Sequence, residues 1–214
     1  MPDAHSLLLF LAAGLALNFT PGPDMLYVAA RGASEGRAAG IVSALGIGAG
    51  TLVHITLVAL GLAALLAAVP VAYTLVRIAG AIYLIYLGVR ALRSKSTLSV
   101  ERLQPASLGA IFRQGVITNV LNPKVALFFL AFLPQFVDPA RGSVSLQVVV
   151  LGALFVGIGL CSDSTYALLA SRFGTWLRTS RSFRHGQRYV AGGIYVGLGV
   201  TAALAGAKTT SASS

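Results

Sequence analysis

Long apolar runs dominate this chain, and short polar connections separate them. Six runs can be drawn, and each is close to or above the length of about 20 residues that a helix needs to cross a bilayer. They are Ser6–Ala30, Gly40–Val69, Val71–Leu92, Gly115–Val137, Leu146–Ala170 and Tyr189–Ala207. The pattern predicts an all-α polytopic membrane protein with six transmembrane helices.

Proline-containing motifs interrupt the first and fourth runs. The first motif is Asn18-Phe19-Thr20-Pro21-Gly22-Pro23-Asp24, and the second is Asn119-Val120-Leu121-Asn122-Pro123-Lys124. A proline inside a helix removes a backbone hydrogen bond and clashes with the preceding turn. We therefore expect helices 1 and 4 to be broken. The first run either crosses fully or forms a re-entrant pair, which would leave five full crossings.

Basic residues gather in the connections that follow the first, third and fifth runs. They are Arg31 and Arg37; Arg93, Lys95, Arg102 and Arg113; and Arg172, Arg178, Arg181, Arg184 and Arg188. Arg90 lies just inside the end of the third run. The opposite connections and the C-terminal end carry only Arg141 and Lys208. By the positive-inside rule the crowded side is cytoplasmic, and both termini lie outside.

This topology divides the chain into two halves of three helices. Because three is odd, the second half enters the membrane inverted relative to the first. We expect residues 1–112 to form the first repeat with its basic cytoplasmic loop, and residues 113–214 to form the second. Small-residue spacing such as Gly40/Ala44/Gly48 suits packing within one chain or between two, so a homo-oligomer stays open.

The composition supports the membrane class. Hydrophobic residues make up 56% of the 214 positions and charged residues 10%, against about 25% charged in soluble domains. The net charge of +10 lies in short loops, so we expect no nucleic-acid partner. The sequence holds no HExxH, no phosphate-binding GxxxxGK[ST] and no serine elbow, which argues against an enzyme and against a cofactor.

Asp24 is the ionisable residue of the first break. Thr20 as N-cap and Pro21 as first helical residue predict a second half-helix that begins near mid-membrane. Such an end binds carboxylates, and Asp24 falls in its first turn. A carboxylate in the membrane costs about 2.5–3.5 kcal/mol on insertion scales, which favours a functional role over a capped kink.

Lys124 is the ionisable residue of the second break. Asn122 is the expected cap and Pro123 the first helical residue. Lys124 then sits in a first turn, where the helix dipole disfavours a cation. It needs Asp24, Asp163 or a substrate carboxylate as partner, unless it snorkels to the cytoplasmic interface.

The candidate substrate-binding residues come from the two breaks: Asn18, Thr20, Pro21, Gly22, Pro23, Asp24, Asn122, Pro123 and Lys124. Asp24 and Asp163 are the candidates for proton coupling, because a buried carboxylate can take up a proton. His54 is an accessory candidate, expected to bond a carbonyl on a neighbouring helix.

At these residues the sequence resembles the LysE/RhtB family of bacterial amino-acid exporters, in its homoserine/threonine/leucine-type branch. The similar stretches are Thr20-Pro21-Gly22-Pro23, Gly80-Ala81-Ile82-Tyr83-Leu84-Ile85-Tyr86-Leu87-Gly88, and Asn122-Pro123-Lys124-Val125-Ala126-Leu127-Phe128-Phe129 running on to Leu133-Pro134-Gln135-Phe136. The resemblance implies export of amino acids or their derivatives across the bacterial inner membrane, driven by the proton-motive force. It does not fix the amino acid or the proton stoichiometry.

The leading hypothesis is a secondary active exporter whose partners are an amino acid, protons and the lipid bilayer. Its two broken helices would hold the zwitterion, with Asp24 on the ammonium, and either Lys124 or a helix N-terminus on the carboxylate. The alternative is an exporter of a metal ion or another small solute, for which only His54, Cys161 and Asp163 are available as ligands. A non-transporting scaffold would leave the paired breaks and buried charges without a purpose.

Overall fold

The computed structural model describes residues 3–68 and 104–179, with the isolated residues Ile82, Tyr86, Val89, Arg93, Tyr189, Gly193 and Val196. Every element in the two continuous segments is helical. The elements are α1 (Ala4–Phe19), α2 (Pro23–Glu35), α3 (Arg37–Ala68), α5 (Leu108–Val120), α6 (Pro123–Leu127), the π-turn η1 (Phe128–Phe132), the 3-10 turns η2 (Leu133–Phe136) and η3 (Pro139–Arg141), and α7 (Val144–Thr179). Most of the third and sixth predicted spans, and most of the stretch from Gly80 to Gly88, lie outside the described residues.

Two helices of the described segments suffice in length and hydropathy to cross a membrane, α3 over Arg37–Gly61 and α7 over Val144–Phe173. Two bent pairs pass the same test together. His5–Phe19 and Pro23–Glu35 meet at 55°, and Leu108–Val120 and Pro123–Phe136 meet at 48°. The predicted interruptions of helices 1 and 4 are confirmed. The described part of the chain therefore has two candidate spans, or up to four if each bent pair counts as one span. The six-helix inverted repeat and its boundary stay predictions.

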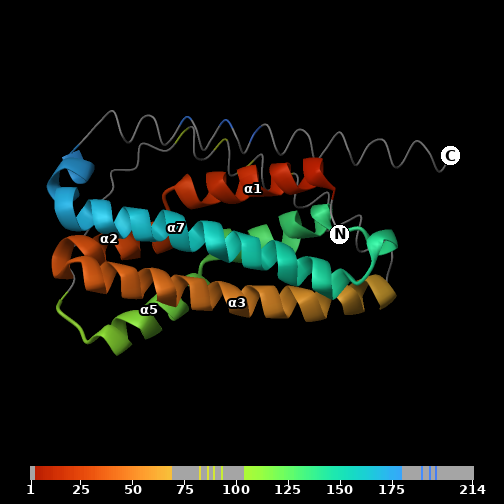
Figure 1. Ribbon diagram of the computed structural model, residues 1–214, viewed down its shortest axis with the longest axis horizontal. Coiled ribbons are helices and arrows are strands. Elements are labelled where there is room, and N and C mark those ends of the chain that lie inside the picture. Colours follow the sequence, from red (N-terminus) through yellow and green to blue (C-terminus); the bar gives the residue numbers. More distant parts are fainter. Residues whose placement is uncertain are drawn as a thin grey trace.

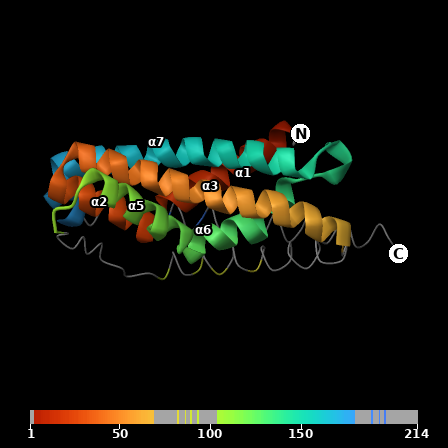
Figure 2. The ribbon, with the colours of Figure 1, turned by 90° about the horizontal axis from the view of Figure 1, so that it is seen from below.

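The described helices run in opposed directions. Figure 1 shows α3 and α7 side by side, with α3 beginning at the end of the molecule where α7 finishes. Figure 2 shows α5 and α6 running from that same end, opposite to the course of α1 and α2. Helix α3 packs against α5 and α7, and α2 packs against α7 and α3. Opposed directions are what an inverted relation requires, and they support that prediction.

Phenylalanine rings fill the larger buried core, between α1, α7 and the segment that follows the second break. Phe128 packs against Phe132 with ring centroids 5.0 Å apart, and against Phe155 at 4.9 Å. Phe10 of α1 joins them, 5.8 Å from Phe128. We call Phe10, Phe128, Phe129, Phe132 and Phe155 the phenylalanine core; each is at most 3% exposed. Large apolar side chains also lie on the surface, such as Leu8, Leu57 and Leu60 at 66%, 62% and 69% exposure, as contact with lipid requires.

Helix α3 meets α5 through glycines. A β-carbon at Gly46 would lie 2.3 Å from the carbonyl oxygen of Phe112, and one at Gly115 would lie 2.9 Å from the carbonyl oxygen of Ser43. Neither position has room for a side chain, so the two backbones pack directly against each other. This contact holds α5 against α3, together with the second break at the end of α5.

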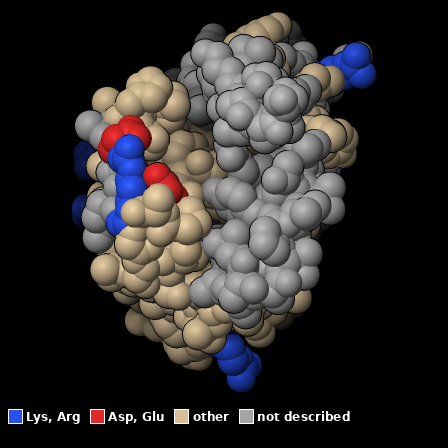
Figure 3. Space-filling view, turned by 90° about the vertical axis from the view of Figure 1, so that its right-hand side faces the viewer, with Lys and Arg blue, Asp and Glu red and all other residues tan. Residues whose placement is uncertain are grey.

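The end of the molecule near the N-terminus carries a small charged group. Asp3 caps α1 by accepting a hydrogen bond from the Ser6 amide at 2.8 Å. Arg141 pairs with Asp138 at 3.1 Å and with Asp3 at 3.5 Å. Figure 3 views this end and shows a basic side chain lying between acidic ones. The hydrogen bonds from Ser6, with a smaller contribution from Arg141, lower the pKa of Asp3.

Candidate functional site

The two broken segments meet, although roughly a hundred residues separate them in the sequence. Asn119, at the end of α5, donates from Nδ2 to Oδ2 of Asp24 at 2.8 Å. Lys124, in the first turn of α6, donates from Nζ to the carbonyl oxygens of Leu17 and Thr20 at 2.9 and 3.0 Å. Each break therefore supplies polar partners for the other, and together they form one site.

The first break differs in detail from its prediction. Thr20 ends α1 instead of beginning α2: its hydroxyl donates back to the carbonyl of Ala16 at 2.8 Å. Gly22 is the N-cap of α2, and Pro23 takes the first turn. The prediction that Thr20 and Pro21 open the second half-helix is wrong, because the hydroxyl satisfies a carbonyl of the preceding turn. Asp24 does lie in the first turn of α2, as predicted.

The carboxylate of Asp24 is buried at the N-terminus of α2. Asp24 is 8% exposed, and its Oδ2 accepts a hydrogen bond from Asn119. The helix dipole favours an anion at this position. Its second oxygen, Oδ1, is buried and has no hydrogen-bond partner within the described residues. Asp24 thus has one oxygen that is hydrogen-bonded and one that is buried and unpaired among the described residues.

The second break is capped as predicted. The side chain of Asn122 accepts from the amide of Lys124 at 3.0 Å, and Pro123 begins α6. The amide group of Asn122 also comes close to the Asp24 carboxylate, but its Nδ2 makes no hydrogen bond in the part of the chain that the structure describes. It is a second buried and open polar group beside Asp24.

Lys124 has a partner that the sequence did not suggest. Its ammonium bonds two carbonyls at the C-terminal end of α1, where the dipole favours a cation. Among the described residues it forms no direct ion pair with Asp24 or Asp163. Its side chain lies along Gly22, where a β-carbon would meet Nζ at 3.0 Å and Cε at 3.2 Å. The glycine permits this approach, and the lysine turns to the first break and does not snorkel.

Asn119 is a site residue that the sequence reasoning did not select. It is 1% exposed and joins three helices. Besides donating to Asp24, it accepts from the Thr51 hydroxyl at 3.3 Å, and its carbonyl accepts from Nε2 of His54 at 3.1 Å. The predicted bond of His54 to a carbonyl on a neighbouring helix is confirmed. The signal for Asn119 was an amide in an apolar run, one turn before a break.

Asp163 belongs to the same site. It lies on α7, is 5% exposed, and interacts electrostatically with Asp24 and Lys124. Asn18 approaches from α1: its Nδ2 lies 3.9 Å from a β-carbon built at Gly159 of α7, and it has no hydrogen-bond partner among residues 3–68 and 104–179. The structure thus gathers Asn18, Asp24, Asn122, Lys124 and Asp163.

The residues proposed as metal ligands do not gather in this way. Cys161 is exposed on α7, whereas His54 and Asp163 are buried. Within the described residues no group of three His, Cys, Asp or Glu side chains is placed to hold a metal ion. The site is instead one of amides, two carboxylates and one ammonium, which suits a small charged organic ligand.

Comparison with known proteins identifies the family. A model described as LysE type translocator matches residues 15–206. The chain belongs to the LysE family. An uncharacterized membrane protein of Vibrio cholerae is 31% identical over 95% of this chain and 98% of its own length. The resemblance predicted from the sequence is confirmed, and the protein is a membrane translocator and not an enzyme.

Two further relatives carry functional names. A homoserine/homoserine lactone efflux protein of Salmonella typhimurium is 28% identical over 82% of this chain and 85% of its own length. A leucine efflux protein of Salmonella choleraesuis is 28% identical over 88% of this chain and 90% of its own length. No solved structure matches the chain.

Proposed function

We propose that this chain is a secondary active exporter of amino acids or amino-acid derivatives in the bacterial inner membrane. The family and the names of the relatives from Salmonella support the substrate class. The single observation that carries the proposal is the meeting of the two breaks. There, Asn18 Nδ2, Asp24 Oδ1 and Asn122 Nδ2 are buried and have no hydrogen-bond partner within the described residues.

These open groups match the two ends of a zwitterion. The open oxygen of Asp24 accepts from the substrate ammonium. The amides of Asn18 and Asn122 donate to the substrate carboxylate. Lys124 uses two of the three N–H groups of its ammonium on Leu17 and Thr20, which leaves one for the same carboxylate. A buried polar group that stays unpaired costs about 1–3 kcal/mol, so a ligand that satisfies three of them is favoured.

Proton coupling rests on the pair of buried carboxylates. Asp24 and Asp163 are 8% and 5% exposed and lie near Lys124, which forms no direct ion pair with either of them among the described residues. The zwitterion is neutral overall, so it does not offset the charge of the second carboxylate. Its ammonium instead competes with a proton for the Asp24 carboxylate, so that binding of one favours release of the other. We propose that Asp163 or Asp24 takes this proton, so that amino acid and proton exchange across the membrane.

Alternating access would use the broken helices. Transporter sites of this kind lie where interrupted helices of two inverted repeats face each other near the middle of the bilayer. We propose that residues 1–112 and 113–214 are these repeats, with both termini outside. One end of the molecule, where α2 finishes and α5 begins, collects the basic residues of four helices. They are Arg31, Arg37, Arg113, Arg172 and Arg178. This distribution supports placing that end in the cytoplasm.

Efflux from proteoliposomes tests the proposal. Vesicles are preloaded with radiolabelled leucine, homoserine or other amino acids, and efflux is followed with and without an imposed pH gradient. Asp24→Asn should abolish efflux, while Asp3→Asn, the same change at an exposed carboxylate, should not. Failure of every amino acid to leave faster than from protein-free vesicles would overturn the proposed function. Full efflux by the Asp24→Asn variant would discard this site.

A further inference from the structure

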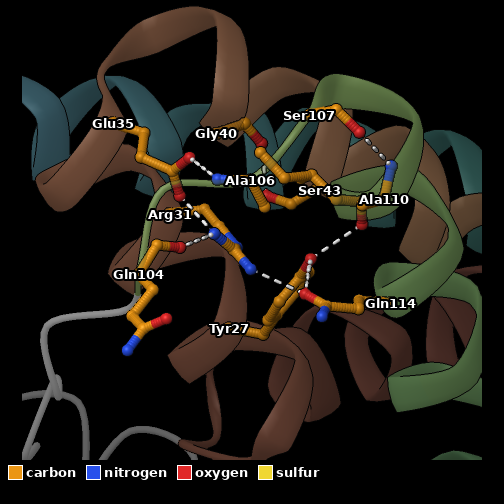
Figure 4. Close-up of polar contacts among 11 residues, drawn as sticks. Tyr27, Arg31, Glu35, Gly40, Ser43, Gln104, Ala106, Ser107, Ala110 and Gln114 are labelled. Carbon is orange, nitrogen blue, oxygen red and sulfur yellow. Dashed lines mark hydrogen bonds and ion pairs between the residues drawn. The ribbon is translucent and has the colours of Figure 1, made fainter.

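A second polar network joins α2 to α5 and to the chain that precedes α5. Figure 4 shows Tyr27, Arg31 and Glu35 of α2 facing Gln104, Ala106 and Gln114. Arg31 is 3% exposed, although the sequence placed it in a cytoplasmic loop. Helix α2 continues past Ala30 to Glu35, and this extra turn buries the guanidinium. A buried arginine between two segments far apart in sequence calls for an explanation beyond topology.

The network is continuous from Tyr27 to Glu35. Arg31 donates from Nη1 to Glu35 and to the carbonyl of Gln104, the latter at 3.1 Å, and from Nη2 to the side-chain oxygen of Gln114 at 2.6 Å. Tyr27 donates to the carbonyl of Ile111 at 2.7 Å, and its ring centroid lies 5.6 Å from the guanidinium carbon of Arg31. Glu35 accepts from the amide of Ala106 at 2.9 Å.

The network lies on the face of α2 that also carries the site. Asp24, Tyr27, Arg31 and Glu35 follow one another at spacings of three, four and four, which places them in one row along the helix. The partners follow the same order on the facing chain: Asn119 binds Asp24, Gln114 and Ile111 bind Tyr27, and Ala106 binds Glu35. The interface between α2 and α5 is therefore polar from the site to the predicted cytoplasmic end.

The other contacts of these helices are of a different kind. Helix α5 lies against α3 at Gly46 and Gly115 with no room for a β-carbon, and α2 lies against α7 at Gly32, where a β-carbon would be 2.6 Å from the carbonyl oxygen of Ala167. Close backbone contacts of this type are van der Waals contacts, and water cannot take the place of either side as it can in a hydrogen bond. The hydrogen bonds between α2 and α5 can be replaced by water, so of these three contacts between described helices this one opens at the lowest cost.

We propose that Tyr27, Arg31, Glu35 and Gln114 form a latch that closes the polar site toward the cytoplasm and must release for substrate to reach Asp24. The proposal rests on the proposed function, because it assumes that a solute enters the site from that end. In the latched state Arg31 and Glu35 neutralise each other. Release exposes their charges to water, and α2 separates from α5 along the row that leads to Asp24.

Cysteine labelling tests the latch. The native thiol is removed by Cys161→Ser, and a reporter is placed by Gly159→Cys, whose β-carbon would lie 3.9 Å from Nδ2 of Asn18. A membrane-impermeant thiol reagent is applied to inverted vesicles and to right-side-out vesicles. Arg31→Gln and Tyr27→Phe break the latch. Arg37→Gln, which removes the same charge from an exposed position on α3, is the matched control.

Arg31→Gln should raise the labelling rate in inverted vesicles about tenfold. A tenfold rise corresponds to a decrease of about 1.4 kcal/mol in the free energy of opening the latch. Tyr27→Phe should raise it by a smaller factor, since one hydroxyl is lost. Neither variant should raise labelling in right-side-out vesicles, and Arg37→Gln should match the parent. Unchanged labelling, or an equal rise from both sides, would overturn the latch. If Arg31→Gln does not insert, Tyr27→Phe decides alone, because it deletes a single oxygen.

This readout is independent of the proposed function. Labelling needs no substrate, so a parent protein that transports no amino acid would overturn the exporter and leave the latch measurement valid. An active exporter whose latch variants label like the parent would overturn the latch alone.

Discussion

Replacing Asn119 by alanine should weaken substrate binding without touching any group proposed to contact the substrate. The asparagine holds Oδ2 of Asp24 at 2.8 Å and is itself fixed by Thr51. A hydrogen bond to a charged group contributes about 1.5–3 kcal/mol. If that free energy orients the carboxylate for the substrate ammonium, its loss corresponds to a factor of roughly 10 to 150 in binding.

The assay is efflux from preloaded proteoliposomes as a function of internal amino-acid concentration. Asn119→Ala should raise the apparent KM at least about tenfold, with a smaller effect on the maximal rate. Asn119→Asp, which keeps the size of the side chain but sets one carboxylate against another, should be worse than alanine. A KM within twofold of the parent for Asn119→Ala would refute the idea that this residue positions Asp24.

Three further changes follow from the same contacts. Lys124→Met should abolish efflux and lower the unfolding midpoint in detergent. Two carbonyls at the end of α1 lose their hydrogen bonds to a charged group, and each such bond typically contributes about 1.5–3 kcal/mol. An unchanged midpoint would contradict the capping role of Lys124. Gly46→Ala should destabilise the protein by about 1–3 kcal/mol through overpacking, whereas Gly61→Ala, with nothing within 4 Å of its β-carbon, should not; equal midpoints would show that α3 and α5 are less tightly packed. Asp163→Asn should remove the acceleration of efflux by an imposed pH gradient while substrate exchange continues; full acceleration would exclude Asp163 as the proton carrier.

The positions of the breaks could be predicted from the sequence because proline acts locally. A missing N–H and a fixed φ end or begin a helix wherever they occur, so Asp24 and Lys124 could be assigned to first turns. The cap of the first break was assigned wrongly because Pro21 and Pro23 suit the first turn equally well. The choice depends on the Thr20 hydroxyl, which bonds the carbonyl of Ala16 behind it.

The partners of the site residues could not be predicted in the same way. Lys124 bonds carbonyls more than a hundred positions away, and no local pattern shows that α1 ends beside α6. Asn119 was not selected because its role depends on Asp24, Thr51 and His54, which belong to two other helices. Arg31 fitted the charge rule for a loop, and only its burial reveals a different role.

Binding of one amino acid to variants of each break tests most directly whether the two breaks form a single site. The purified protein in nanodiscs is titrated with the best substrate from the efflux screen. The account predicts one ligand per chain, and weaker binding for both Asn18→Ala in the first break and Asn122→Ala in the second. An unchanged Kd for either variant would contradict a shared site.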